Sequence, residues 1–251
     1  MLLAIVLVAA IVGSFLTVAT EDENGVEWLK RKRSQCPNCL RPLGVVDLIP
    51  VFSFLIQGGK CRYCRKNIPI RHLIIELSTI VIFVVTFLVI QDRPIQEIIL
   101  ILGVMTFLFA ITITDLRFQT LPDSFLFILA ILGIVKIYIL GAPTLIEGIL
   151  GLALGAVIFG LIVVLSKGKA MGLGDVKLSS VMGILFGWKV LIVVLFFSFV
   201  AGGLLGLLLM LLKKVTPKSQ IPFGPFLAGS TALFLLFPDL FKTFLLLLGL
   251  R

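Results

Sequence analysis

Charged side chains are scarce in this chain: they make up 14% of its 251 residues, whereas 59% of the residues are hydrophobic. A typical soluble domain has about 25% charged residues. The apolar residues gather in runs that approach the ~20 residues a helix needs to cross about 30 Å of hydrocarbon. This composition argues against a single compact soluble core, and we expect an all-α polytopic membrane protein.

Histidine is almost absent, since His72 is the only one. Catalysis by a Ser–His or Cys–His pair would have one possible base, in a segment without an obvious nucleophile. A metalloprotease with an H-E-x-x-H motif is excluded, because it needs two histidines. The sequence also contains no glycine-rich phosphate loop of the Walker type. If the chain is an enzyme, its chemistry rests on other side chains.

The hydrophobic runs predict about eight transmembrane helices separated by short polar stretches. They cover residues 2–19, 73–90, 97–114, 124–140, 145–165, 176–187, 190–212 and 225–248. The sixth run would rise only about 18 Å as a helix, so it is either tilted in a thinned bilayer or re-entrant. We prefer a true crossing, because a re-entrant segment would place Lys213 and Lys214 outside.

Most of the 22 Lys and Arg residues fall in loops that one topology places on the same side of the membrane. Positive residues stay on the cytoplasmic side, so we expect an N-terminus outside and these loops inside. The first run differs from a signal peptide because its basic cluster, 30–33, follows the apolar stretch. We therefore expect a retained helix at 1–19, and the net charge of +9 requires no nucleic-acid partner.

The four cysteines form two close pairs, Cys36-Pro37-Asn38-Cys39 and Cys61-Arg62-Tyr63-Cys64. Two C-x-x-C pairs at this separation predict a tetrahedral zinc site with four thiolate ligands. Such a site has no open position for water, so the zinc would be structural and would hold together a small domain at 20–72. Disulfides or free thiols are the alternatives.

Two acidic residues stand at the ends of predicted spans. Asp115 follows the third span, and Asp175 begins the sixth within Gly172-Leu173-Gly174-Asp175-Val176-Lys177. A charged residue beside hydrocarbon costs at least about 2.5 kcal/mol on insertion scales, so such acids are candidate site residues. The expected topology puts both at the cytoplasmic face, where their helices can bring them together as an aspartic protease pair.

Other residues near these acids allow several interpretations. Gly172 and Gly174 would let the backbone approach an extended peptide, and Lys177 is a supporting candidate beside them. Asp123 competes with Asp115 but is better explained as the N-cap of the fourth span. Each acid alone could be an interfacial charge that snorkels into headgroups. A small transporter or channel that binds cations or protons, and a non-catalytic scaffold with a zinc module, are the alternative functions.

The motifs, taken in order, resemble bacterial type IV prepilin peptidases. They are Gly13-Ser14-Phe15-Leu16, the first cysteine pair, Asp47-Leu48-Ile49-Pro50, the second cysteine pair preceded by Gly59-Lys60, Thr114-Asp115 with Leu121-Pro122-Asp123, the 172–177 motif, and Pro222-Phe223-Gly224-Pro225. The resemblance covers nearly the whole chain. It implies that residues 73–251 form an aspartic protease core similar to presenilin-type enzymes, with Asp115 and Asp175 as the catalytic aspartates.

The resemblance also implies a reaction and a location. Enzymes of this family lie in the bacterial cytoplasmic membrane, surrounded by lipid, with the active site at the cytoplasmic face. They remove the short basic leader of prepilins and pseudopilins after a glycine and then methylate the new N-terminus with S-adenosylmethionine. The family's four cysteines fall on Cys36, Cys39, Cys61 and Cys64. The chain departs from many members at Thr17, where they have asparagine, in the N-terminal part associated with methyl transfer.

Overall fold

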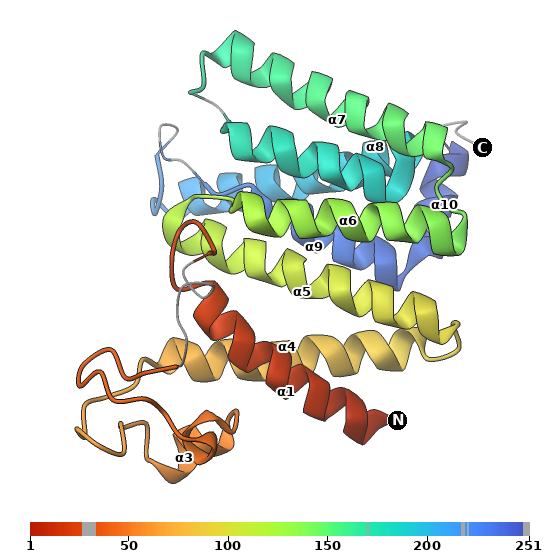
Figure 1. Cartoon of the computed structure of the whole chain (residues 1–251). Coiled ribbons are helices and arrows are strands. Elements are labelled where there is room, and N and C mark those ends of the chain that lie inside the picture. The colour runs from red at the N-terminus through yellow and green to blue at the C-terminus, as the bar shows by residue number, and fades with distance from the viewer. Residues whose placement is uncertain (27–33, 170, 217–218, 220, 248–251) are drawn as a thin grey trace. The chain divides into compact units, whose positions relative to one another are not determined.

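The computed structural model describes residues 1–26, 34–169, 171–216, 219 and 221–247, and the basic cluster at 30–33 lies outside these ranges. Apart from two isolated β-bridges, the regular structure of the described residues is helical (Figure 1), which confirms the all-α prediction. The helices are α1 (Leu2–Ala19), the 3₁₀ helix η1 (Val45–Leu48), α3 (Phe52–Ile56), α4 (Ile70–Ile90), α5 (Ile95–Phe118), α6 (Asp123–Leu140), α7 (Leu145–Ser166), α8 (Leu173–Leu211), α9 (Gly224–Leu236) and α10 (Pro238–Leu247).

The chain divides into two compact units, Met1–Asp92 and Arg93–Arg251, called unit 1 and unit 2 below. Six of the described helices are long and apolar enough to cross a membrane: α1 and α4 in unit 1, and α5, α6, α7 and α8 in unit 2. The protein is therefore a multi-pass membrane protein. The expectation of about eight spans differs from this count for two reasons: two predicted runs join in one helix, and one predicted run is broken into two short helices.

In unit 1, α1 and α4 approach each other closely at a glycine. A Cβ atom on Gly13 would lie 3.0 Å from the Cα atom of Glu76, so only glycine allows this contact without a shift. The Glu76 carboxylate in turn accepts a hydrogen bond of 2.7 Å from the backbone N–H of Val51. The polar segment between the two helices is thus tied to the beginning of α4.

In unit 2, α7 and the first part of α8 lie side by side and pack backbone against backbone (Figure 1). A Cβ atom on Gly155 would lie 2.6 Å from the carbonyl oxygen of Ser179, and one on Gly151 would lie within 3 Å of the backbone of Gly183. Ser179 Oγ also donates a hydrogen bond of 3.1 Å to the Gly155 carbonyl. Small residues permit this approach, which holds the beginning of α8 firmly against α7.

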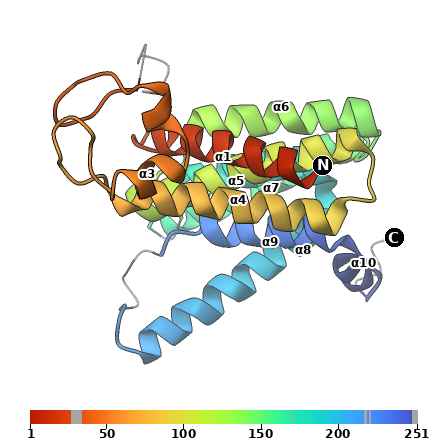
Figure 2. The same ribbon diagram turned by 90° about the horizontal axis from the view of Figure 1, so that it is seen from below.

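The predicted spans 176–187 and 190–212 join in α8, but Gly187 interrupts the helix. Its φ of 78° and ψ of 166° lie outside the helical region, in a conformation that residues with a Cβ rarely adopt. Figure 2 shows the second part of α8 running obliquely to α6. The break that the hydrophobic pattern indicated therefore exists, and it rests on one glycine.

The expectation of one span over 225–248 is wrong. Helix α9 ends at Leu236, and α10 begins at Pro238. A proline disfavours the helical conformation in the residue before it, and Phe237 accordingly has φ −127° and ψ 61°. Two helices too short to count as spans replace the predicted one.

Candidate active site

Asp115 lies in the last turn of α5 and is buried, with 6% of its surface exposed. Its Oδ2 accepts a hydrogen bond of 2.8 Å from the backbone N–H of Gly224, the first residue of α9. The first N–H groups of a helix have no partner within the helix, and the helix dipole favours a negative charge there. The start of α9 is therefore a suitable place for the Asp115 carboxylate.

Asp175 lies in the first turn of α8 and is partly buried. Its Oδ2 accepts a long hydrogen bond of 3.4 Å from the backbone N–H of Gly172, the N-cap residue. Gly174, next to Asp175, and Gly224, which binds Asp115, both lie against the Leu121 side chain, so the fold brings the two aspartates to one region although the sequence separates them widely. We call them the aspartate pair.

Leu121 lies between the segments that carry the aspartate pair. A Cβ atom on Gly174 would lie 3.2 Å from the Leu121 side chain, and one on Gly224 would lie 3.3 Å from its Cδ2. A Cβ on Gly224 would also lie 2.6 Å from Asp115 Oδ2. The site residues expected from the sequence include Gly174 but neither Leu121 nor Gly224. The signals for both were the short proline motifs at 121–123 and 222–225.

Lys177 and Asp123 form an ion pair. Lys177 Nζ lies 2.7 Å and 3.0 Å from the two carboxylate oxygens of Asp123, and both side chains are more than half exposed. This contact joins the start of α6 to the start of α8, beside Asp175. The N-cap role expected for Asp123 is wrong, because Pro122 is the N-cap residue and no side chain caps the helix.

The four cysteines of unit 1 come together. Their sulfur atoms all lie within 4.8 Å of one another, and Cys36 Sγ lies 3.9 Å from Cys64 Sγ. Four thiolates at about 2.3 Å from one zinc ion are separated by about 3.8 Å in a tetrahedron. The spacing of the thiols therefore fits a four-coordinate metal ion.

The two cysteine pairs share one backbone turn. In each, the backbone N–H of the first cysteine donates a hydrogen bond to the carbonyl oxygen five residues later. The backbone N–H of the residue after the second cysteine donates a hydrogen bond to the carbonyl oxygen of the first cysteine. Those last residues, Leu40 and Arg65, both have a positive φ, of 57° and 60°. An isolated antiparallel bridge closes each turn. The two turns are thus equivalent, as a pair of metal-binding knuckles requires.

The thiols differ in acidity. A hydrogen bond from the backbone amide of Cys39 is the main cause that lowers the pKa of Cys36 to about 7. The pKa of Cys64 is raised to about 11, because the hydrogen bond from the Lys66 amide, which lowers it, is outweighed by desolvation and the neighbouring thiols. Packed thiolates repel one another, and a bound divalent cation removes that repulsion. The cluster can hold a metal in a closed shell.

Two family matches cover most of the chain. Residues 7–90 match the family described as "Bacterial Peptidase A24 N-terminal domain", and residues 102–207 match the "Type IV leader peptidase family". The first match falls within unit 1 and contains the four cysteines. The second falls within unit 2 and contains both aspartates.

Similar proteins are named prepilin leader peptidase/N-methyltransferase. The protein from Bacillus subtilis (strain 168) is 32% identical over 208 residues, which cover 82% of each chain. The protein from Aeromonas hydrophila is 30% identical over 226 residues, covering 87% of this chain and 77% of that one. The protein from Pseudomonas aeruginosa is 28% identical over 225 residues, covering 87% of this chain and 76% of that one. No solved structure matches the chain.

Proposed function

Since this chain belongs to the type IV leader peptidase family, we propose that it is an aspartic endopeptidase that cuts the leaders of prepilins and pseudopilins after a glycine. The observation that carries the proposal is the aspartate pair: Asp115 is buried against the Gly224 amide, with the charge of Asp175 close enough to act on it. Asp115 comes from the end of α5 and Asp175 from the start of α8, and in each the printed hydrogen bond goes to Oδ2.

The proposed chemistry needs only a peptide and a water molecule. The ionised carboxylate of the aspartate pair takes a proton from the water, whose oxygen attacks the carbonyl carbon after the leader's glycine. The protonated carboxylate donates its proton to the carbonyl oxygen. Collapse of the tetrahedral intermediate breaks the C–N bond: the leaving nitrogen takes the proton that came from the water, and the other carboxylate takes back a proton from a hydroxyl group of the intermediate. The pair then holds one proton again.

We place the protein in the bacterial cytoplasmic membrane with its N-terminus outside. This orientation puts most of the Lys and Arg residues in cytoplasmic loops. The C-terminal end of α5 and the start of α8 then lie at the cytoplasmic face. A pilin's basic leader, still in the cytoplasm, would meet its apolar helix at this level. The cut would fall at that junction.

We assign the cysteine cluster to a structural zinc ion held by Cys36, Cys39, Cys61 and Cys64. A zinc ion with four protein ligands has no open position, so it stabilises the surrounding segment of unit 1 and takes no part in the reaction. The equivalent backbone turns of the two cysteine pairs support this role.

Methylation of the new N-terminus with S-adenosylmethionine is the second activity that we propose. Unit 1 contains a cavity of about 600 Å³, within the range of roughly 300–1,000 Å³ that is usual for sites of small ligands. Thr17, Glu21, Asp47, Phe54 and Glu76 are among the residues that line it. The acids suit the donor's amino group and ribose hydroxyls, and Phe54 suits a purine ring.

One experiment tests both activities. Purified wild type, Asp115→Asn and Asp175→Asn are incubated with a full-length prepilin and, separately, with a mature pilin that already has a free N-terminus. We expect both variants to lose cleavage of the prepilin, followed by the size of the pilin. We expect both to keep transferring a labelled methyl group to the mature pilin, because the cavity lies in the other unit. Undiminished cleavage in either variant would refute the proposed peptidase site.

A further inference from the structure

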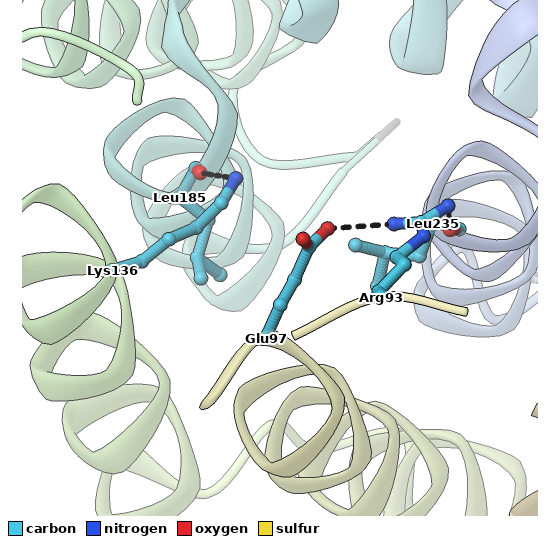
Figure 3. Close-up of polar contacts among 5 residues, drawn as sticks. All are labelled: Arg93, Glu97, Lys136, Leu185 and Leu235. Atoms are coloured by element: carbon cyan, nitrogen blue, oxygen red, sulfur yellow. Dashed lines mark hydrogen bonds and ion pairs between the residues drawn. The ribbon is translucent and has the colours of Figure 1, made fainter. Parts of the chain in front are cut away.

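Three charged residues lie at the ends of α5 and α6 opposite the aspartate pair. Glu97 is in the first turn of α5, Arg93 precedes that helix, and Lys136 is in the last turns of α6. Figure 3 shows the three side chains converging from separate elements. We call them the far-end network. Charged groups are costly at membrane depth and mark functional positions by default, and the peptidase chemistry uses none of these three.

Lys136 caps the first part of α8. Its Nζ donates a hydrogen bond of 2.9 Å to the carbonyl oxygen of Leu185 and lies 4.7 Å from the ring centroid of Phe186. Leu185 is two residues before Gly187, where the helix is interrupted. Carbonyls in the last turn before such a break lack regular helical partners, and a cation there is favourable. Lys136 therefore stabilises the end of the segment that begins at Asp175.

Arg93 caps α9 in the same way. Its guanidinium donates a hydrogen bond of 3.2 Å to the carbonyl oxygen of Leu235, one residue before α9 ends. The same guanidinium lies 2.8 Å from a carboxylate oxygen of Glu97. Helix α9 begins at Gly224, the residue that binds Asp115. Both short helical segments that serve the aspartate pair thus have their opposite ends capped by a cation.

These contacts fasten α6 to α8 at both ends. Near the aspartate pair, Asp123 of α6 pairs with Lys177 of α8. At the far end, Lys136 of α6 binds the Leu185 carbonyl of α8. The segment that carries Asp175 is therefore held along its length.

Helices α5 and α9 are fastened in a parallel way. Near the reacting groups, the Gly224 amide of α9 binds Asp115 of α5. At the far end, Arg93, just before α5, binds the Leu235 carbonyl of α9. One helix pair therefore holds Asp115, and the other holds Asp175.

Glu97 connects the two helix pairs. It forms the ion pair with Arg93, and Figure 3 shows its carboxylate between the side chains of Arg93 and Lys136, where its attraction for Lys136 offsets the repulsion between the two cations. We propose that Glu97, together with Arg93 and Lys136, positions the aspartate pair for cleavage by fixing one helix pair relative to the other. This inference rests on the proposed function, since it assigns positioning residues to that same site.

The test uses the full-length protein with four substitutions. Lys136→Met removes the cation and keeps the length of the side chain, Lys136→Arg keeps the cation, and Glu97→Gln removes the charge that connects the pairs. Asp92→Asn is the matched control, because it neutralises an exposed acid next to Arg93 in the chain that forms no ion pair or hydrogen bond with the network among the described residues. The rate of prepilin cleavage is measured and divided by the concentration of active enzyme. That concentration is determined by titration with a peptide inhibitor that carries a hydroxyl group at the cleavage position.

A displacement of reacting groups by about 1 Å can cost on the order of 100-fold in rate, so we expect Lys136→Met and Glu97→Gln to lower kcat about 10-fold. KM should change less than about 2-fold, because the network is remote from the bound leader. Lys136→Arg and Asp92→Asn should keep most of the wild-type kcat. The double variant with Lys136→Met and Glu97→Gln should lose no more than about either single variant, because the two residues act as a unit.

Three results would overturn the inference. The first is a kcat equal to that of the wild type in Lys136→Met and Glu97→Gln, calculated per active enzyme molecule, even if less folded protein is recovered. The second is a Lys136→Arg variant as slow as Lys136→Met. The third is full additivity in the double variant. Asp115→Asn and Asp175→Asn are run in parallel, because normal cleavage by either would refute the proposed function itself and not the network.

Discussion

The backbone N–H of Gly224 donates a hydrogen bond of 2.8 Å to Oδ2 of Asp115, although 109 residues separate the two in the chain. The bond joins the end of α5 to the start of α9 and provides a buried carboxylate with a partner. A buried polar group without a hydrogen bond would be strongly unfavourable. The arrangement leaves no room for a larger residue at 224.

Replacement of Gly224 by alanine should impair cleavage, because the added Cβ would lie 2.6 Å from Asp115 Oδ2. The carboxylate must move, and a shift of about 1 Å in a reacting group can cost on the order of 100-fold in rate. We expect a loss of at least about 10-fold in kcat, measured by prepilin cleavage. The control is Gly229→Ala on the same helix, where no atom lies within 4 Å of the added Cβ. Equal activity of the two variants would contradict this prediction.

Replacement of Gly174 by alanine should also slow cleavage, through Leu121. The added Cβ would lie 3.2 Å from the Leu121 side chain, which must give way beside Asp175. Overpacking of this kind costs about 1–3 kcal/mol, or roughly 5- to 100-fold if it is expressed in the rate. The second substitution Leu121→Ala should restore part of the rate. Leu121→Ala alone serves as the reference, and a double variant slower than both would show that the contact is not the cause.

Asp123 should be far less sensitive than Asp115. Its ion pair with Lys177 is largely exposed, and exposed ion pairs contribute about 0.2–1 kcal/mol. Asp123→Asn should therefore lower kcat less than about 5-fold, whereas Asp115→Asn should abolish turnover. Both variants are compared in the same cleavage assay with active-site titration. Complete inactivation by Asp123→Asn would make that residue a member of the catalytic set.

The purified protein should contain about one zinc ion per chain, because its four thiols are spaced for one tetrahedral ion. Cys36→Ser and Cys61→Ser should each reduce the zinc content below about one tenth, since both residues are buried members of the proposed ligand set. Metal analysis after gel filtration measures the change. Asn38→Ser, within the first knuckle but not a ligand, should retain the metal. Zinc that persists without Cys36 and Cys61 must be bound elsewhere.

Sequence patterns located several parts of the fold and the candidate site well. Apolar runs predicted a polytopic all-α protein, and their ends identified Asp115 and Asp175 as acids beside hydrocarbon. The two C-x-x-C pairs predicted a cluster that the structure brings together. These inferences succeed because helix length in a membrane and ligand spacing in a knuckle are local properties of the chain.

The hydrophobic pattern could not locate every helix boundary. The run at 225–248 is mostly apolar, yet Pro238 ends the helix before it. Asp123 follows a proline as a helix-start acid, yet its carboxylate binds Lys177 instead of capping α6. Hydropathy measures what a segment buries in lipid, and it carries no information about backbone geometry or about distant partners.

The sequence by itself determined that this protein spans a membrane, that its thiols are spaced for a metal, and which two aspartates stand at helix ends. Only the tertiary structure decided that Gly224 binds Asp115, that Leu121 lies against Gly174, and that Arg93 binds both Glu97 and the Leu235 carbonyl. The physical reason is the distance along the chain over which the deciding interactions act. Helix formation and membrane insertion depend on neighbouring residues, whereas the distance between two carboxylates depends on how helices pack over the whole unit.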